Sequence, residues 1–308
     1  MDTKPLLSII IPTKDRQDIF DISCLFLIKA IQDFDIEVIV INDSKVNEVT
    51  LPEKLTKVRI IKNNQSGVAS ARNLGASLAK GKWLLFLDDD MLINEENIHS
   101  YLRYTNREGK FCVNIEWAYP PDLINQIKQN AFGRFLIKYG FTTMRGWSGN
   151  PLWPQNSSIT VKSITSQNLF LTTQLFIETG GYNENFPYAG FEDYAFSKHL
   201  EKNGFEMYVD TTSLMYHNEI DRTEPKAWFK RKERGGETRR IATTQGYREV
   251  EIKQNLIKKT FYLCTHIIEP LIGVILFFSD RFKITDMVSF TCYKALLGIS
   301  INKGYNKK

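Results

Sequence analysis

The chain has 308 residues, of which 43% are hydrophobic and 24% are charged, which argues against disordered, collagen-like and coiled-coil proteins. The formal net charge of +5 is unevenly distributed, because residues 1–225 carry 23 basic and 28 acidic side chains whereas residues 226–308 carry 17 and 7. A slightly acidic body suits a metal or a neutral substrate, and a basic C-terminal part suits an anionic surface.

Strands and helices are expected to alternate over residues 1–90. Continuous apolar, β-branched runs predict strands that are buried on both faces, and apolar residues at helical spacing predict helices between them. The expected strands are residues 6–12, 37–42, 58–62 and 82–87, and the expected helices are residues 18–32 and 68–79, the second capped by Ser66. This order predicts an α/β fold with a mostly parallel sheet and a ligand site at the carboxyl ends of its strands.

The pattern is looser after residue 90. Helices are expected at residues 94–104, 121–139, 173–179 and 191–203, and short strands at residues 111–115, 166–171, 205–209 and 213–217. Residues 140–158 are rich in Gly, Trp and Pro and predict a long loop. A loop of that length in a compact domain is more often a lid or a binding segment than a simple connection.

Three carboxylates, Asp88, Asp89 and Asp90, directly follow the strand expected at residues 82–87. A charged turn is the plain alternative, but like charges so close together repel one another unless a cation or hydrogen-bond donors compensate them. A divalent metal that carries a diphosphate explains them economically, because hard oxygen ligands suit Mg²⁺ or Mn²⁺. The sequence has no GxxxxGK[ST], no GxGxxG after the first strand and no HExxH, which argues against the sites that those motifs build.

Five segments resemble, in order and at fitting spacing, the successive motifs of family 2 glycosyltransferases. They are SIIIPTKDR (residues 8–16), VIVINDS (38–44), NNQSGVASARNLGASLAKGKWLLFLDDDM (63–91), GGYNENFPYAGFEDYAFSKHL (180–200) and LMYHNE (214–219). The resemblance covers about residues 6–219. It implies the GT-A fold, a Rossmann-like and mostly parallel sheet flanked by helices, and an inverting transfer of a sugar from a nucleotide diphosphate donor.

The resemblance also implies which residues hold the donor. The nucleoside is assigned to Pro12, Thr13, Asp15 and Asp43, and the ribose or the sugar to Asp88, Asp89 and Asn168. A carboxylate at Asp43 can accept a hydrogen bond from the imide of uracil or thymine, which favours a UDP- or dTDP-sugar; an Asx-turn residue is the alternative. Arg72 is expected to point to the diphosphate or the base, or else to be a charge on a helix surface.

The same resemblance assigns the metal to Asp90 and to His217, a residue type that on its own is more often structural. The role of Asp89 stays open, since it could bind the ribose, the sugar or the metal. A metal site with a carboxylate and an imidazole favours Mn²⁺ slightly over Mg²⁺. Glu192 and Asp193 begin a predicted helix, where two acids can simply complement the helix dipole. The resemblance makes Asp193 the general base for the acceptor hydroxyl and Glu192 a residue that holds the acceptor.

Residues 226–240 contain seven basic and two acidic residues, with two aromatic side chains between them. This composition suits nucleic acid or an anionic membrane surface. No nucleic-acid-binding motif accompanies it, so nucleic acid is not expected and the membrane surface is favoured. Residues 261–278 are apolar but contain a histidine, a glutamate and a proline, so an interfacial helix, an accessory helical pack or homo-oligomer surface, and a membrane span all stay open.

These patterns predict a GT-A catalytic domain at residues 1–225 and a basic helical region at residues 226–308. The expected activity is metal-dependent hexosyl transfer to a hydroxyl of a glycan or lipid-linked acceptor in polysaccharide biosynthesis, with Trp147 and Trp153 either stacked on sugar or buried in the core. The alternatives are a sugar nucleotidyltransferase, whose Gly-rich loop is missing after the first strand, and a noncatalytic glycan- or membrane-binding relative. Four separated cysteines without a CxxC pair predict a cytoplasmic protein, peripheral on the cytoplasmic face if it binds membrane.

Overall fold

The computed structural model describes residues 4–52, 58–149, 153–254 and 256–307. The chain divides into two compact units. The first comprises residues 1–118 and 152–218, and the second comprises residues 119–151 and 219–308. Residues 119–151 therefore interrupt the first unit in sequence and fold with the C-terminal part, while the predicted domain boundary near residue 225 stays a prediction.

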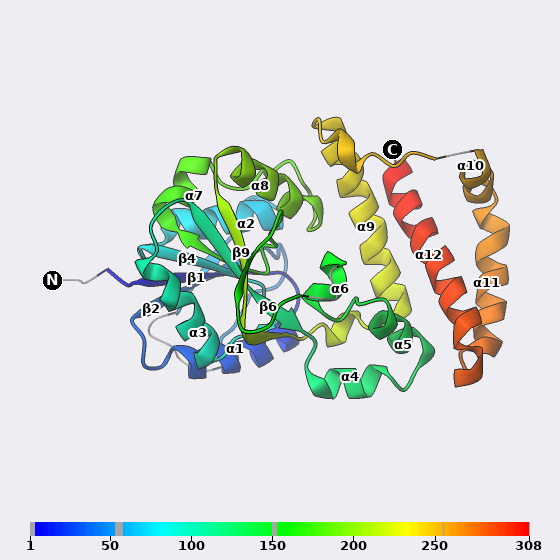
Figure 1. Ribbon diagram of the computed structural model, residues 1–308, viewed down its shortest axis with the longest axis horizontal. Coiled ribbons are helices and arrows are strands. Elements are labelled where there is room, and N and C mark those ends of the chain that lie inside the picture. Colours follow the sequence, from blue (N-terminus) through cyan, green and yellow to red (C-terminus); the bar gives the residue numbers. More distant parts are fainter. Residues whose placement is uncertain (1–3, 53–57, 150–152, 255, 308) are drawn as a thin grey trace. The chain divides into compact units, whose positions relative to one another are not determined.

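The first unit is a nine-stranded sheet covered by helices (Figure 1). Its strands are β1 (Leu7–Thr13), β2 (Ile36–Asn42), β3 (Val58–Lys62), β4 (Trp83–Leu87), β5 (Met91–Leu92), β6 (Phe111–Ala118), β7 (Ser158–Thr160), β8 (Asn168–Thr172) and β9 (Glu206–His217). Its helices are α1 (Gln17–Ile31), α2 (Val68–Leu78), α3 (Glu95–Leu102), the 3-10 turn η1 (Arg103–Asn106), α7 (Thr173–Thr179) and α8 (Phe191–Lys202). Figure 1 shows α1 and α3 below the sheet and α2, α7 and α8 above it, so both faces are covered.

The strand order is β3-β2-β1-β4-β8-β6-β9-β5, with β7 paired to β9. The strands β1 to β4 form a parallel group, β8 runs antiparallel to β4 and to β6, and β9 runs parallel to β6. The predicted α/β fold is confirmed, although the antiparallel pairs of β5, β7 and β8 were not foreseen. The strands β1 and β4 are buried along their whole length, because a central strand between two helical layers needs apolar side chains on both faces.

Strand β9 is continuous where two short strands were predicted. Its register against β6 shifts, because Ile115 pairs with Asp210 whereas the next residue, Glu116, pairs with Leu214. Residues 211–213 are therefore a bulge that the strand accommodates without ending.

The helix predicted at residues 121–139 is two helices, α4 (Pro121–Ile127) and α5 (Ala131–Lys138). The side chain of Asn130 accepts a hydrogen bond from Gly133 N at 2.7 Å and so caps α5. Gly133 also lies against α4, where an added Cβ would come within 1.9 Å of Ile127 O. A sharp turn between two helices that touch through a glycine replaces the single long helix.

The second unit is helical. Besides α4 and α5 it contains α6 (Met144–Ser148), η2 (Ile220–Arg222), α9 (Pro225–Thr244), η3 (Arg248–Val250), α10 (Leu256–Leu263), α11 (Thr265–Ser279), η4 (Lys283–Thr285) and α12 (Asp286–Asn306). Figure 1 shows α12 in red between α9 in yellow and α11 in orange. Phe132 and Phe135 of α5 pack with Trp228 of α9 and Tyr293 of α12. Trp228, which the sequence places among basic residues, is thus a buried core residue.

The helices α9 and α12 touch through their backbones at two glycines. A Cβ at Gly236 would lie 2.1 Å from Ile301 O, and a Cβ at Gly304 would lie 1.7 Å from Glu233 O. These distances are far below contact distance, so only glycine permits the approach.

Candidate active site

The carboxyl ends of β1 and β4 bring four polar side chains together. Thr13 Oγ1 donates to Asp89 Oδ2 at 2.7 Å. Arg16 Nη1 donates to Asp89 Oδ1 and, at 3.0 Å, to Asp90 Oδ2. Both carboxylates are buried and lie in a turn after β4, where Thr13 and Arg16 compensate them, so the alternative of a charged turn stays open.

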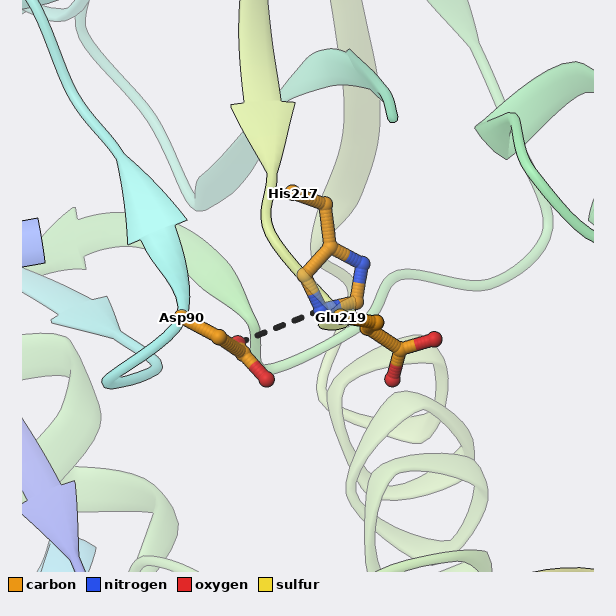
Figure 2. A group of neighbouring side chains, drawn as sticks. All are labelled: Asp90, His217 and Glu219. Carbon is orange, nitrogen blue, oxygen red and sulfur yellow. Dashed lines mark ion pairs between the residues drawn. The ribbon is translucent and has the colours of Figure 1, made fainter. Parts of the chain in front are cut away.

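Asp90 also faces His217 (Figure 2). Strand β5 begins directly after Asp90 and pairs with the end of β9, so that Met91 lies opposite His217. Asn218 N donates to Asp90 O at 2.7 Å and extends the pairing. His217 Nε2 lies 3.2 Å from Asp90 Oδ1, and both side chains are buried. The sheet therefore brings together the two residues that were predicted to hold a metal.

Glu219 follows His217 by two residues and is the first residue of the C-terminal segment of the second unit. It is a buried side chain of a type that binds metal ions, and Figure 2 also draws it. Within its own unit it accepts hydrogen bonds from Tyr119 Oη and Arg231 Nη1 and lies 3.3 Å from Arg222 Nη1. In the sequence, Glu219 ends the segment LMYHNE (214–219), and no role was predicted for it.

The donor set at Asp90 and His217 fits a divalent cation. Mn²⁺ binds both a carboxylate oxygen and an imidazole nitrogen, whereas Mg²⁺ prefers the carboxylate oxygen. A plain Asp–His ion pair is the structural alternative, and it is the interaction that this structure contains.

Asp43 ties the end of β2 to the start of α2. Its Oδ1 accepts from Asn63 Nδ2 at 2.8 Å and from Gly67 N at 3.0 Å, and its Oδ2 accepts from Lys14 Nζ at 3.0 Å. Gly67 is the N-cap of α2 with a φ of 119° and without a side-chain cap bond, so the predicted cap at Ser66 is wrong. A φ in this range favours glycine.

Asp15 lies in the loop after β1 with a φ of 54°, which is uncommon for a residue other than glycine. Its Oδ1 accepts from Ser44 Oγ at 2.6 Å and from Asn47 Nδ2 at 2.8 Å. These hydrogen bonds lower the pKa of Asp15 below its usual value. Pro12 lies inside β1 opposite Ile41, and its apolar side chain has no hydrogen-bonding group.

Arg72 is the centre of a second charged cluster. Its side chain is 2% exposed, so the alternative of a charge on the helix surface is wrong. Nη2 lies 2.8 Å from Asp88 Oδ1, and Nη1 lies 3.2 Å from Glu192 Oε1 and 3.6 Å from Asp193 Oδ1. The guanidinium also lies 5.4 Å from the ring centre of Tyr182. A single buried cation thus joins the end of β4 to the start of α8.

The two acids of this cluster differ in access to solvent. Glu192 is 1% exposed, whereas Asp193 is 23% exposed. Burial and the neighbouring charge of Asp193 raise the pKa of Glu192 to about 8, although Arg72 opposes the shift. Glu192 also accepts from Gly190 N. Asp193 is therefore the acid that a hydroxyl from solvent can reach.

Ser166 holds Asp193. Its hydroxyl donates to Asp193 Oδ1. Burial raises the pKa of Asp193, while Arg72 and the Ser166 hydrogen bond lower it. A carboxylate that is partly exposed, fixed in position and more basic than usual suits a general base. The contact was not predicted, because Ser166 and Asp193 come from separate elements.

Asn168 and Trp153 lie outside both clusters. Asn168 is fully buried in β8, and its Nδ2 donates to Ile115 O at 2.9 Å. Trp153 is buried, which favours the core interpretation, whereas residues 150–152 and the side chain of Trp147 lie outside the described part. The described remainder of the predicted loop contains α6 and the start of β7.

Comparisons with known proteins identify the family. The family model described as Glycosyl transferase family 2 matches residues 8–158. A Haemophilus influenzae protein named an uncharacterized glycosyltransferase is 27% identical over 222 residues, which cover 68% of this chain and 67% of that protein. An Escherichia coli protein named UDP-Glc:alpha-D-GlcNAc-diphosphoundecaprenol beta-1,3-glucosyltransferase is 26% identical over 176 residues, which cover 56% of this chain and 61% of that protein.

A solved structure shares the fold. The crystal structure of GalNAc-T7 with UDP, GalNAc and Mn²⁺ aligns with a TM-score of 0.51 at 16% identity and covers 70% of this chain and 43% of that chain. The alignments thus span about two thirds or less of each of these three proteins. At such low identity the structural likeness shows the fold alone.

Proposed function

Because this chain belongs to glycosyltransferase family 2, we propose that it moves a hexose from a nucleotide diphosphate donor to a hydroxyl of a glycan or lipid-linked acceptor, with inversion at the anomeric carbon. The observation that carries the proposal is the cluster in which Arg72 joins Asp88, at the end of β4, to Asp193, at the start of α8. Donor-side and acceptor-side carboxylates thereby share one cation.

The donor in this proposal is a UDP- or dTDP-sugar. Asp43 accepts hydrogen bonds from Lys14, Asn63 and Gly67, and Gly67 N lies within hydrogen-bond distance of both carboxylate oxygens. The imide of a pyrimidine base would take the place of Lys14, whose side chain is half exposed. Thr13 and Asp15 lie beside it at the end of β1 and complete the proposed nucleoside site.

The proposed metal is Mn²⁺ or Mg²⁺ on Asp90 and His217, with Asp89 next to it on the ribose, the sugar or the metal. Such an ion supplies positive charge for the departing diphosphate. The mixed oxygen and nitrogen ligands favour Mn²⁺.

Asp193 is the proposed base. Its carboxylate takes the proton of the acceptor hydroxyl while that oxygen attacks the anomeric carbon, and the bond to the diphosphate oxygen breaks with its electron pair leaving on the nucleoside diphosphate. Ser166 fixes one carboxylate oxygen, and Arg72 offsets negative charge on both sides of the reacting bond. Glu192, too buried to be the base, holds Arg72 and the acceptor side of the site.

The acceptor class is proposed from the chemistry named for a relative. The Escherichia coli protein is named for a diphosphoundecaprenol-linked sugar as acceptor, and this chain carries a basic C-terminal region. We propose a lipid-linked diphosphate acceptor and a site of action at the cytoplasmic face of the membrane, as in polysaccharide biosynthesis.

The test is sugar transfer by the full chain in Mn²⁺, from UDP- and dTDP-sugars to glycan and polyprenyl diphosphate acceptors. Asp193→Asn keeps the shape of the side chain but removes its basicity, so donor binding should persist while turnover falls by roughly 100-fold or more. Glu201→Gln, an exposed change on the same helix, is the matched control and should keep full activity. Substantial turnover by Asp193→Asn would rule out Asp193 as the base.

A further inference from the structure

Exposed apolar side chains gather on one segment of the second unit. Of 21 large hydrophobic residues that are exposed in the described part of the chain, 11 lie between residues 263 and 288, with exposed fractions from 43% to 93%. The set, called here the α11 apolar face, is Leu263, Ile267, Leu271, Val274, Ile275, Phe277, Phe278, Phe282, Ile284, Met287 and Val288. Single exposed apolar residues are ordinary on a protein surface, whereas a gathered set marks a binding surface.

Most of this set is the outer side of α11. The inner side packs Ile268, Ile272 and Leu276, each four residues from the next, in a cluster with Ile299 of α12. The outer residues repeat at intervals of three and four and continue through η4 into the first turn of α12. Because α12 lies between α9 and α11 (Figure 1), the second unit buries one side of α11 and leaves its other side uncovered within the unit.

The exposed charged side chains of this segment are basic, whereas its three acids are partly buried. Glu269 pairs with Lys303, Asp286 pairs with Arg134, and Asp280 accepts a hydrogen bond from Tyr293 Oη. The two basic residues at the turn, Arg281 and Lys283, are exposed. The guanidinium of Arg281 lies over the ring of Phe277, 4.5 Å from its centre, so a basic group is in direct contact with the apolar face.

We propose that the α11 apolar face inserts into the interfacial region of an anionic lipid bilayer, with α11 lying along the membrane plane and with Arg281 and Lys283 at the headgroups. A broad apolar side bordered by basic residues is the pattern of an interfacial helix. This proposal rests on the proposed function only in that transfer to a lipid-linked acceptor gives the chain a reason to bind a membrane. Its test uses lipid binding alone, so it can fail while sugar transfer stands.

A membrane span is disfavoured by the packing. The helical segment Lys283–Asn306 passes a test of length and apolar composition for a span. Its helix α12, however, packs closely on α9 through Gly304 and on α11 through Ile299, and a span would have to leave both. The helix α11 has 15 residues and is about 22 Å long, whereas the hydrocarbon core of a bilayer is about 30 Å thick.

A second copy of the chain is also disfavoured as the occupant. Val274, Ile275, Phe277 and Phe278 are all exposed and occupy more of the circumference of α11 than the narrow seam of a two-helix contact needs. A bilayer covers such a broad side without requiring a matching shape, and its anionic headgroups suit Arg281 and Lys283.

The experiment is flotation of the full chain with phosphatidylcholine vesicles, with and without phosphatidylglycerol, at low salt and at about 1 M salt, where charges are screened beyond roughly 3 Å. The variant Leu271→Glu/Phe278→Glu places two charges on the face. The matched control is Val46→Glu/Ile177→Glu, which changes two exposed apolar residues of the first unit. Arg281→Gln/Lys283→Gln isolates the contribution of charge, and thermal melts of all variants verify folding.

Wild type and control should bind anionic vesicles, and a measurable part should stay bound at high salt. Leu271→Glu/Phe278→Glu should lose at least tenfold in binding, and Arg281→Gln/Lys283→Gln should lose only the salt-sensitive part. Equal binding by the wild type and Leu271→Glu/Phe278→Glu, complete release by salt, or no binding at all would overturn the proposal. A wild-type dimer in sedimentation that Leu271→Glu/Phe278→Glu turns into a monomer would assign the face to a second copy instead.

Discussion

A single residue, Arg72, compensates three carboxylates in the first unit: Asp88, Glu192 and Asp193. Burial is the largest cause of the raised pKa of Glu192, and the neighbouring charge of Asp193 adds to it, while Arg72 opposes it.

The raised pKa of Glu192 predicts a pH dependence of stability. The pKa rises from about 4.5 in the unfolded chain to about 8 in the folded chain, so between these values only the folded chain keeps the proton. The contribution of Glu192 to the free energy of unfolding therefore falls as the pH rises from about 4.5 to about 8. The Tm should fall over this interval more steeply for the wild type than for Glu192→Gln, and parallel curves would contradict the assignment.

Ser166 should act as a positioning residue for Asp193. Removing its hydroxyl in Ser166→Ala frees the carboxylate and takes away a hydrogen bond that lowers its pKa. The kcat should fall roughly tenfold, the size expected for one hydrogen bond to a charged group, and the acidic limb of the pH–rate profile should move to higher pH. Ser166→Thr, which keeps a hydroxyl, should restore the profile; a purely structural role would leave the profile of Ser166→Ala unmoved.

The acidic residues and the histidine of the candidate site could be predicted from the sequence, whereas the residues that donate hydrogen bonds to the acids could not. Asp90 and His217 follow predicted strands, and the pairing of β5 with β9 brings them together. Arg16 and Ser166 escaped prediction, because their partners are 73 and 27 residues away in the chain and only the folded sheet brings them close.

At the scale of elements, two adjacent glycines of α9 should respond oppositely to the same change. A Cβ at Gly236 would meet Ile301 O of α12 at 2.1 Å, whereas a Cβ at Gly235 meets nothing within 4 Å. Gly236→Ala should lower the free energy of unfolding by about 1–3 kcal/mol through overpacking, and Gly235→Ala should raise it by about 0.5–1 kcal/mol. Denaturant titrations measure both, and equal effects would disprove the close packing of α9 on α12.

Strands of the parallel group were the most predictable elements. Residues 58–62 and residues 83–87 of the expected run 82–87 are strands. The buried apolar run explains β4, whereas β3 is a partly exposed strand at the end of the strand order. The division of residues 121–139 into two helices and the bulge at residues 211–213 depend on one cap and one register shift. Such local features leave little trace in hydrophobic periodicity.

At the scale of the whole molecule, the association of residues 119–151 with residues 219–308 was not predictable. Apolar spacing identifies α5 and α9 as helices, but no local pattern states that Phe132 will pack on Trp228. The basic character of the C-terminal part was visible in the sequence, whereas the structure places its aromatic residue in a core and its exposed apolar residues on α11.

Donor and metal binding should stabilise the whole chain against unfolding. A ligand that binds only the folded chain stabilises it by about 2.7 kcal/mol at a hundredfold excess over Kd. UDP- or dTDP-sugars with Mn²⁺ should therefore raise the Tm by several degrees in a thermal-shift assay. Asp90→Ala should lose the Mn²⁺-dependent part of the shift, and Asp33→Ala, a change at an exposed acid of the first unit, should keep it. An undiminished Mn²⁺-dependent shift in Asp90→Ala would place the metal elsewhere.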